Sequence, residues 1–262
     1  KSFMNKTDWN DLLGARLRGL VVEGKTDEMI IQGFLDFGQQ SGFWQNWNRQ
    51  LLVKQVAGKD NIFDEMERDD NRIWGLIDRD AYSSAKLDDL QRQYPRLLIL
   101  PRWTIENYFI IPDELGKIYP DVQVKLESHR QNWVQHGALW HVLQEQGVFE
   151  ENYPRKLFDM PIRRDEEIRA LLIRWQNQIQ PDTILEKYHH TLQSFRADSD
   201  NDFTQHIYGK IFFKAIVKPL LDQYVQDKNG KIFNLDRIKE NLLIRFNACP
   251  PDLIPILRRV VK

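Results

Sequence analysis

The sequence predicts an α/β fold, in which a parallel β-sheet is flanked by helices. Four short apolar runs of the kind that form buried strands, at residues 20–22, 51–53, 73–77 and 97–100, alternate with amphipathic stretches. Strands that alternate with helices favour parallel βαβ units, whose helices cover both faces of the sheet. The chain has 262 residues, 42% of them hydrophobic, which is enough for one large domain with a sizeable insertion.

The stretches between these runs carry the signals of helices. Thr26 and Asp27 offer an N-cap for a first helix, whose apolar residues recur at helical spacing. Gly58 breaks the second run, and a short acidic helix is expected over residues 62–67. Pro101 closes the last run. Before that run, a further helix is expected around Leu87, Leu90 and Tyr94.

Beyond Pro112 the composition changes. Residues 122–202 are rich in Gln, Glu, Trp and His, and their apolar residues recur at helical spacing. Examples of that spacing are Ile168, Leu171, Leu172 and Trp175. We therefore expect a helical insertion after the sheet.

The last part of the chain is expected to be helical and basic. An amphipathic helix is predicted from Phe203 onward, and residues 203–262 contain 11 Lys and Arg but only five Asp and Glu. This excess fits either solvated helix faces or a surface that contacts phosphate. The predicted organisation is a core over residues 1–112, a helical insertion over 113–202, and a basic helical segment over 203–262 that completes the domain.

The chain as a whole is almost neutral, with 37 Lys and Arg against 38 Asp and Glu. This argues against a protein that coats nucleic acid by bulk electrostatic attraction. No stretch approaches the ~18 apolar residues of a membrane span, and the N-terminus lacks the apolar run of a signal peptide. A single cysteine, Cys249, excludes a disulfide framework and a cysteine-based metal cluster. We expect a cytoplasmic protein that does not bind membranes.

Acidic residues stand at or just beyond the ends of three predicted strands. They are Glu23, Asp27, Asp78, Asp80 and Glu106. Because the carboxyl ends of parallel strands meet at one edge of a sheet, these side chains are expected to converge there. Converging carboxylates repel one another unless a cation neutralises them, and Mg²⁺ and Mn²⁺ prefer oxygen ligands. The pattern predicts a metal site, and ordinary N-caps and solvated loop acids are the alternative.

Two of these segments resemble the TOPRIM fold, a Rossmann-like parallel sheet. Residues 20–27 look like its first strand and glutamate, and residues 77–80 look like its aspartate pair after an apolar strand. TOPRIM domains occur in topoisomerases, bacterial primases and OLD-type nucleases. Residues 58–61 and 105–108 resemble one branch of that family, the standalone PARIS-effector-like proteins found beside ABC-type ATPases in phage-defence operons. The resemblance covers residues 18–112 and extends weakly to residues 203–220 through Gly209 and Lys210.

The resemblance implies a nuclease with two Mg²⁺ or Mn²⁺ ions. Its implied metal ligands are Glu23, Asp27, Asp78, Asp80 and Glu106. Among them, Glu23, Asp78 and Asp80 are also implied as catalytic residues. The resemblance adds Lys210, which matches a late lysine near the scissile phosphate. Lys210 fits the role of an ordinary surface lysine equally well. Lys59, Thr104 and Lys214 are expected to contact the substrate, and Lys59 alternatively shapes the turn after the second strand.

The same branch implies a biological role. In that role the protein is a toxic endonuclease effector of an anti-phage system. An ABC-type ATPase restrains it until infection, and a homodimer is one active form. The branch favours RNA, including transfer RNA, as the substrate, whereas the OLD-type likeness favours nicking of DNA. A non-catalytic TOPRIM subunit that binds an ATPase is a further alternative. A primase or strand-passing enzyme would need a zinc module or a tyrosine domain, for which the chain has little room.

Histidines and tryptophans are weaker candidates. His189 and His190 lack further ligands at zinc spacing and are expected at a solvated helix end. Three tryptophans offer platforms on which nucleobases can stack, although aromatic residues at helical spacing more often belong to the core. These three are Trp133, Trp140 and Trp175.

Overall fold

The sheet confirms the predicted α/β class. The computed structural model describes residues 9–68, 71–80, 82–146, 180–222, 224 and 234–261. Its four strands are all parallel, in the order β2-β1-β3-β4, as in Rossmann-like folds. Each strand coincides with one of the four predicted apolar runs. They are β1 (Arg18–Val22), β2 (Leu51–Gln55), β3 (Ile73–Ile77) and β4 (Leu97–Ile99).

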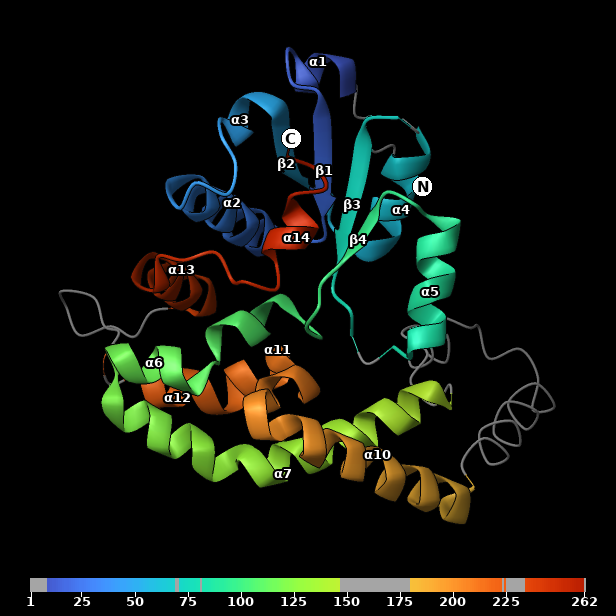
Figure 1. The fold of residues 1–262 in the computed structure, drawn as a ribbon, viewed down its shortest axis with the longest axis vertical. Coiled ribbons are helices and arrows are strands. Elements are labelled where there is room, and N and C mark those ends of the chain that lie inside the picture. Colours follow the sequence, from blue (N-terminus) through green and yellow to red (C-terminus); the bar gives the residue numbers. More distant parts are fainter. Residues whose placement is uncertain are drawn as a thin grey trace, which may run out of the picture.

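Helices cover both faces of the sheet, which is the middle of three layers (Figure 1). Along β1, Val21 packs on one face while Leu20 and Val22 pack on the other, because successive side chains of a strand alternate. The face of Val21 is covered by α1 (Trp9–Leu13), α4 (Lys59–Arg68) and α5 (Ser84–Gln93). The opposite face is covered by α2 (Lys25–Gln40) and α14 (Ile254–Leu257), and α13 (Leu235–Phe246) packs on α2. A short helix, α3 (Trp47–Gln50), precedes β2.

A helical region follows β4 and lies beyond the carboxyl ends of the strands (Figure 1). A 3-10 turn, η1 (Ile105–Phe109), leads into it. Its main helices are α6 (Pro112–Ile118), α7 (Pro120–Glu145) and α10 (Pro181–Asp202), and α7 packs along α10. Helices are thus found where residues 122–146 and 180–202 were expected to form them. The predicted helical residues Ile168, Leu171, Leu172 and Trp175 lie outside the described part of the chain.

The segment after Phe203 is broken, whereas the sequence predicts one amphipathic helix. A 3-10 turn, η2 (Phe203–His206), comes first, and Ile207 and Tyr208 separate it from the following helix. That helix contains a π turn at its centre, a local widening that is rare in proteins and frequent at functional sites. Its parts are α11 (Gly209–Phe212), η3 (Phe213–Val217) and α12 (Lys218–Leu221).

A single apolar core joins the sheet to the helical region. Phe109 of η1 stacks on Phe34 of α2 and Phe246 of α13, with ring centroids 6.2 and 6.0 Å apart. The same core contains Leu98 of β4 and Phe212 of α11. This shared burial holds the helical region against the carboxyl edge of the sheet. Among the described residues, no helix is both long and apolar enough to cross a membrane.

The start of α2 differs from the prediction. Gly24, and not Thr26 or Asp27, is the N-cap residue, in extended conformation. The Asp27 carboxylate instead lies in the first turn and accepts a hydrogen bond from the Gly24 N–H at 3.0 Å. The Thr26 hydroxyl donates to Asp236 of α13 at 2.8 Å. As a result, the helix begins two residues early, and Asp27 points back towards the end of β1.

Candidate functional site

The carboxyl ends of the strands meet at the edge of the sheet that faces the helical region (Figure 1). After β1 the chain moves to β2 on one side, and after β3 it moves to β4 on the other. The neighbouring strands β1 and β3 therefore flank the point where the topology reverses. In open parallel sheets, ligands bind in the crevice at this point. Glu23 directly follows β1 and Asp78 directly follows β3, so two predicted acids stand at this position.

A small cavity opens between these two strand ends. Glu23, Asp27 and Asp78 line it, together with apolar side chains that include Ile31 and Ile105. Its volume is about 10 Å³, which is close to the space of one water molecule. The sequence predicted that acids of β1, α2 and β3 converge, and these three line one cavity.

Electrostatic coupling extends to all five acids. Burial raises the pKa of Asp27 from 3.8 to about 6, with further contributions from the charges of Glu106 and Glu23. Burial also raises the pKa of Asp78 well above its ordinary value, and the charges of Glu106, Asp27 and Asp80 add to this increase. The residues are 2 to 83 positions apart in sequence, yet the charges of others in the group act on Asp27, Asp78 and Asp80. We call Glu23, Asp27, Asp78, Asp80 and Glu106 the carboxylate cluster.

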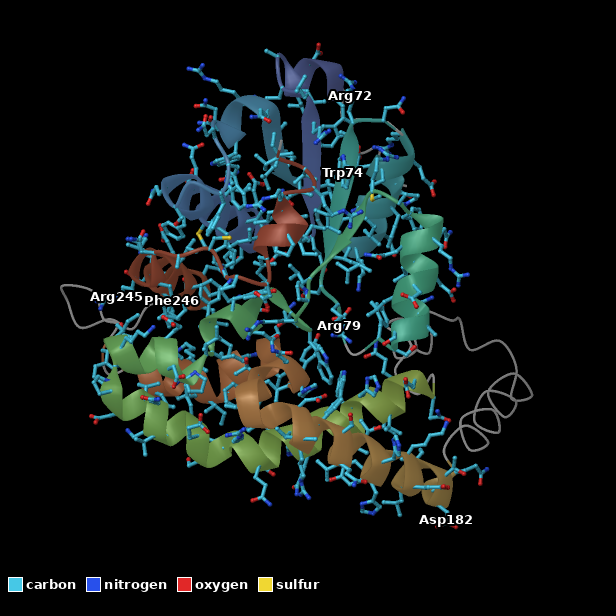
Figure 2. All side chains as sticks on the ribbon, viewed as in Figure 1. Arg72, Trp74, Arg79, Asp182, Arg245 and Phe246 are labelled. Carbon is cyan, nitrogen blue, oxygen red and sulfur yellow. The ribbon has the colours of Figure 1, made fainter. Side chains whose placement is uncertain are left out.

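Asp78 is held by the backbone that follows β4. One of its oxygens accepts a hydrogen bond from the Ile105 N–H at 3.0 Å. The neighbouring Arg79, labelled between the sheet and the helical region in Figure 2, donates to the Pro101 carbonyl at 3.2 Å. These contacts tie the loop after β3 to the segment that carries Glu106.

Asp80 is paired with a lysine. Its carboxylate lies 2.6 Å from the Lys59 Nζ, and both side chains are only about one-eighth exposed. The Asp80 backbone is left-handed, with φ of 50°, and its N–H donates to the Trp103 carbonyl at 2.7 Å. Burial raises the pKa of Asp80, while the charges of Lys59 and Lys210 oppose this effect. Lys59, predicted to contact substrate, is thus the direct counter-ion of Asp80.

Glu106 is paired with a second lysine, from a distant part of the sequence. Its carboxylate lies 2.7 Å from the Nζ of Lys239 on α13. The exposed fractions of the two side chains are 6% and 10%. Because a buried charge without a partner is costly, this pair fixes α13 against η1. The metal-ligand role expected of Glu106 therefore competes with an internal cation.

Thr104 is fully buried, and its hydroxyl hydrogen-bonds to the Asn107 side chain at 2.9 Å. Asn107 in turn donates to the carbonyls of Thr204 and Ile207. A substrate contact by Thr104 would require this hydroxyl to become accessible. Gly209 packs directly on the same pair, because a Cβ there would lie 2.2 Å from the Asn107 Oδ1.

Lys210 follows Gly209 and is exposed. Its charge acts on Asp80, so the structure brings the predicted late lysine to the border of the carboxylate cluster. Lys214, one helical turn farther along, is exposed within the π turn η3. Both lysines thus lie on the helix that Gly209 anchors to η1.

The letters of residues 19–26 also match the phosphate-binding loop pattern G-x-x-x-x-G-K-T. The structure excludes that loop, because β1 extends to Val22 and α2 begins at Lys25. Only Glu23 and Gly24 connect them, and two residues are too few to surround a phosphate chain. The connection instead presents the Glu23 side chain, which is exposed at the edge.

The donor set suits a hard divalent cation, since it consists of carboxylate oxygens. Within the described residues, however, no group of three or more His, Cys, Asp or Glu side chains is arranged to hold a metal ion. Two of the five acids are engaged by lysines, and three line the small cavity. Glu23, Asp27 and Asp78 would hold a cation there only after these side chains rearrange.

Two contributors to the site were not identified from the sequence. Lys239 was visible only as one of many basic residues near the C-terminus, since nothing in the sequence links it to Glu106. Asn107 directly follows the predicted ligand Glu106. It also lies three residues after Thr104, a spacing typical of residues that cap the start of a helical turn. Comparison with protein-family models, curated proteins and solved structures finds no match to the chain. The function is therefore inferred from the side chains themselves.

Proposed function

We propose that the protein is a Mg²⁺- or Mn²⁺-dependent endonuclease that hydrolyses phosphodiester bonds, with RNA favoured over DNA. The observation that carries the proposal is the mutual charge coupling of the carboxylate cluster at the point where the sheet topology reverses. Acids with raised pKa values in a crevice are typical of functional sites. Folding has brought these charges together at a cost, and a bound cation would offset that cost.

Each part of the site has a role in this proposal. Glu23, Asp27 and Asp78 would hold the principal ion, which, when bound, polarises the phosphodiester and activates water. Asp80 and Glu106 support a second ion or, through their lysines, set the charge of the site. Lys210 extends from the border of the cluster and would bind a phosphate oxygen of the substrate.

The resemblance to standalone TOPRIM effectors extends the proposal to biology. In this proposal the protein is a toxic effector of anti-phage defence, kept inactive by an ABC-type ATPase and active as a homodimer, with transfer RNA as one substrate. DNA nicking is the alternative reaction. Expression of the protein alone, with RNA and plasmid from the same cells analysed on gels, identifies which polymer is cut.

The decisive experiment compares two isosteric changes. Asp78→Asn removes one carboxylate of the cavity, whereas Asp88→Asn removes an exposed carboxylate on α5. With Mg²⁺ and labelled transfer RNA, single-stranded DNA and plasmid, we expect the unmodified protein and Asp88→Asn to cleave, and EDTA to stop them. Asp78→Asn should lose about 100-fold or more of the rate. Full activity of Asp78→Asn would refute the proposal.

A second candidate function is a non-catalytic subunit that binds an ATPase. The observation that favours it is the pairing of Asp80 and Glu106 with Lys59 and Lys239, which leaves a cavity of only about 10 Å³. Calorimetry with Mg²⁺ and Mn²⁺ separates the two functions. Absence of binding at millimolar metal, together with stable association with an ATPase, would favour the subunit.

A further inference from the structure

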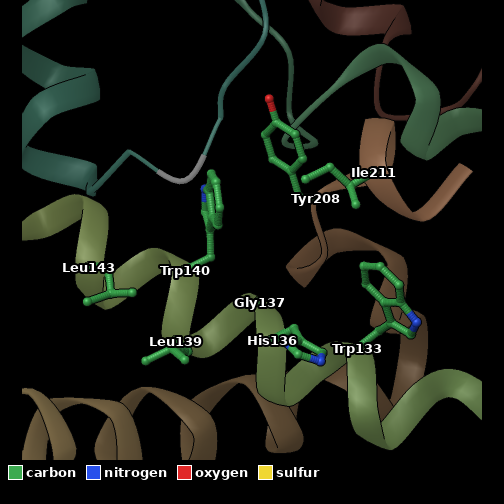
Figure 3. A pocket seen from close by; sticks show the side chains of 8 residues that line it. All are labelled: Trp133, His136, Gly137, Leu139, Trp140, Leu143, Tyr208 and Ile211. Carbon is green, nitrogen blue, oxygen red and sulfur yellow. The ribbon is translucent and has the colours of Figure 1, made fainter. Parts of the chain in front are cut away.

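A pocket lined by aromatic side chains lies in the helical region. Its volume is about 410 Å³, within the range of small-molecule sites. One wall is the C-terminal half of α7 and the other is the segment around the start of α11 (Figure 3). Its lining includes Trp133, His136, Leu139, Trp140, Tyr208 and Ile211.

The aromatic rings of this pocket differ in their surroundings. Trp133 packs edge-on against the buried Phe212, with centroids 4.8 Å apart, and thus belongs to the pocket floor. Trp140 and Tyr208 come from opposite walls, with centroids 5.3 Å apart and planes inclined by 35°. Both are only half-buried, and Figure 3 shows their rings projecting towards the same side. A planar apolar group could therefore stack on either ring.

The pocket is held in a fixed position relative to the carboxylate cluster. Gly137 of α7 packs on η2 so closely that a Cβ would lie 1.8 Å from the His206 carbonyl oxygen. Gly209 packs in the same way on Asn107 of η1, the turn that carries Glu106. Two close glycine contacts, one with the His206 backbone and one with the Asn107 side chain, thus connect α7, the start of α11 and η1.

Exposed cations stand on the helix that forms one wall of the pocket. Tyr208 and Ile211 line the pocket, and Lys210 lies between them in sequence, exposed, with its charge acting on Asp80. Lys214 is exposed one turn farther along. An apolar pocket for a flat ring, beside exposed ammonium groups, matches a nucleotide with its base and phosphates. An apolar protein segment would use the pocket but not the cations.

We propose that this pocket binds an unstacked nucleobase of the substrate, while Lys210 and Lys214 contact the adjoining phosphates. The inference rests on the proposed nuclease function and specifies its substrate as a single strand or loop. In a duplex the bases are stacked and paired, so they cannot enter an aromatic pocket without being flipped out. The pocket therefore selects the loops of a folded RNA over its stems.

Binding measured without cleavage tests the pocket directly. The probes are a fluorescein-labelled oligoadenylate and the same backbone with abasic residues, in EDTA, read by fluorescence anisotropy. The unmodified protein is expected to bind the oligoadenylate about tenfold more tightly than the abasic strand, the loss that removing one base–aromatic stack produces. In Trp140→Ala the affinities for the two strands should become equal, and Trp140→Phe should restore most of the preference for the oligoadenylate.

Two further changes keep the test independent of folding defects. Leu139→Trp fills the pocket from an exposed position, and the affinities for the two strands should become equal in this variant as well. Ile211→Ala at the pocket is matched by Ile244→Ala, an exposed apolar residue on α13, and only the former should weaken base-dependent binding. Equal affinity of the unmodified protein for both strands would overturn the inference.

The remaining outcomes separate this inference from the proposed function. Base-dependent binding that is lost in Trp140→Ala, in a protein without metal-dependent cleavage, would support the pocket and refute the nuclease. Cleavage with no base-dependent binding would refute the pocket alone. A change of oligomeric state in Trp140→Ala by light scattering, with the ratio unchanged, would identify the pocket as a protein interface and refute the inference.

Discussion

Two kinds of carboxylate stand at the same edge of the sheet. Asp80 and Glu106 are paired with Lys59 and Lys239, at 2.6 and 2.7 Å. Asp27 and Asp78 instead accept backbone N–H groups, and burial raises their pKa values as it raises that of Asp80. The first kind is in direct contact with a lysine, whereas lysine charges act on the second kind only from a distance. We propose that the paired acids stabilise the fold and that the acids without a lysine contact are the ones available to an external cation.

The largest effect should come from breaking the most buried pair. Lys239→Met leaves Glu106 charged and buried without its partner, which is expected to cost about 3–5 kcal/mol of unfolding free energy. Urea denaturation at neutral pH measures this loss. Lys125→Met, at an exposed lysine of α7, should change stability by less than about 0.5 kcal/mol.

A double variant tests whether the unpaired charge of Glu106 causes the loss of stability in Lys239→Met. In Lys239→Met combined with Glu106→Leu, no buried charge is left alone, and most of the lost stability should return. If the double variant is as unstable as the single one, packing of the lysine stem, and not its charge, holds α13 in place.

A smaller effect on stability is expected from the titration of Asp27, which has no lysine in direct contact. The pKa of Asp27 is raised from 3.8 to about 6 on folding, so between these values the folded state binds more protons than the unfolded state. The contribution of Asp27 therefore favours folding at low pH and is lost as the pH rises from about 4 to about 6. Its full size is roughly 3 kcal/mol, because one unit of pKa corresponds to about 1.4 kcal/mol.

Asp27→Asn isolates this contribution. The difference in unfolding free energy between pH 4.5 and pH 7 should shift by roughly 2 kcal/mol relative to the unmodified protein, with the variant more stable at pH 7. Chemical denaturation at both pH values measures it. An identical pH dependence in both proteins would show that Asp27 titrates normally and is not coupled to the cluster.

The smallest expected effect is stabilisation by metal. A cation that binds the acids without lysines raises the unfolding free energy by about 1.4 kcal/mol when its concentration is ten times its dissociation constant. We expect Mg²⁺ to raise the melting temperature of the unmodified protein at pH 7, and to have no such effect on Asp78→Asn. Equal shifts in both proteins would place the bound metal elsewhere.

The sequence was sufficient where the signal is local or follows from strand topology. The runs at 20–22 and 73–77 are apolar and each is followed by an acid. Both the strands and the proximity of Glu23 to Asp78 could therefore be predicted. Contacts between distant segments could not be predicted in this way. Nothing near Glu106 indicates that a lysine of α13 lies beside it, since that contact depends on how helices pack on the sheet.

Short polar residues near helix starts were also ambiguous. Thr26, Asp27 and Gly24 all suit an N-cap, and only the backbone decides that Gly24 takes this position. Thr104 shows the same limit, because a hydroxyl predicted to contact substrate is buried against Asn107. For Trp140 the sequence left open a place in the core or a platform for nucleobases. The structure places it at a pocket, and helical spacing alone does not indicate what lies opposite a residue.

The pairing of Glu106 with Lys239 has a consequence for synthesis of the protein. The two residues are 133 positions apart, which a ribosome covers in on the order of ten seconds. Until then the nascent chain holds all four strands and every acid of the edge, but not the cation that Glu106 needs when buried. We therefore expect the acidic edge to be the last part of the molecule to fold, after most of the chain has left the ribosome.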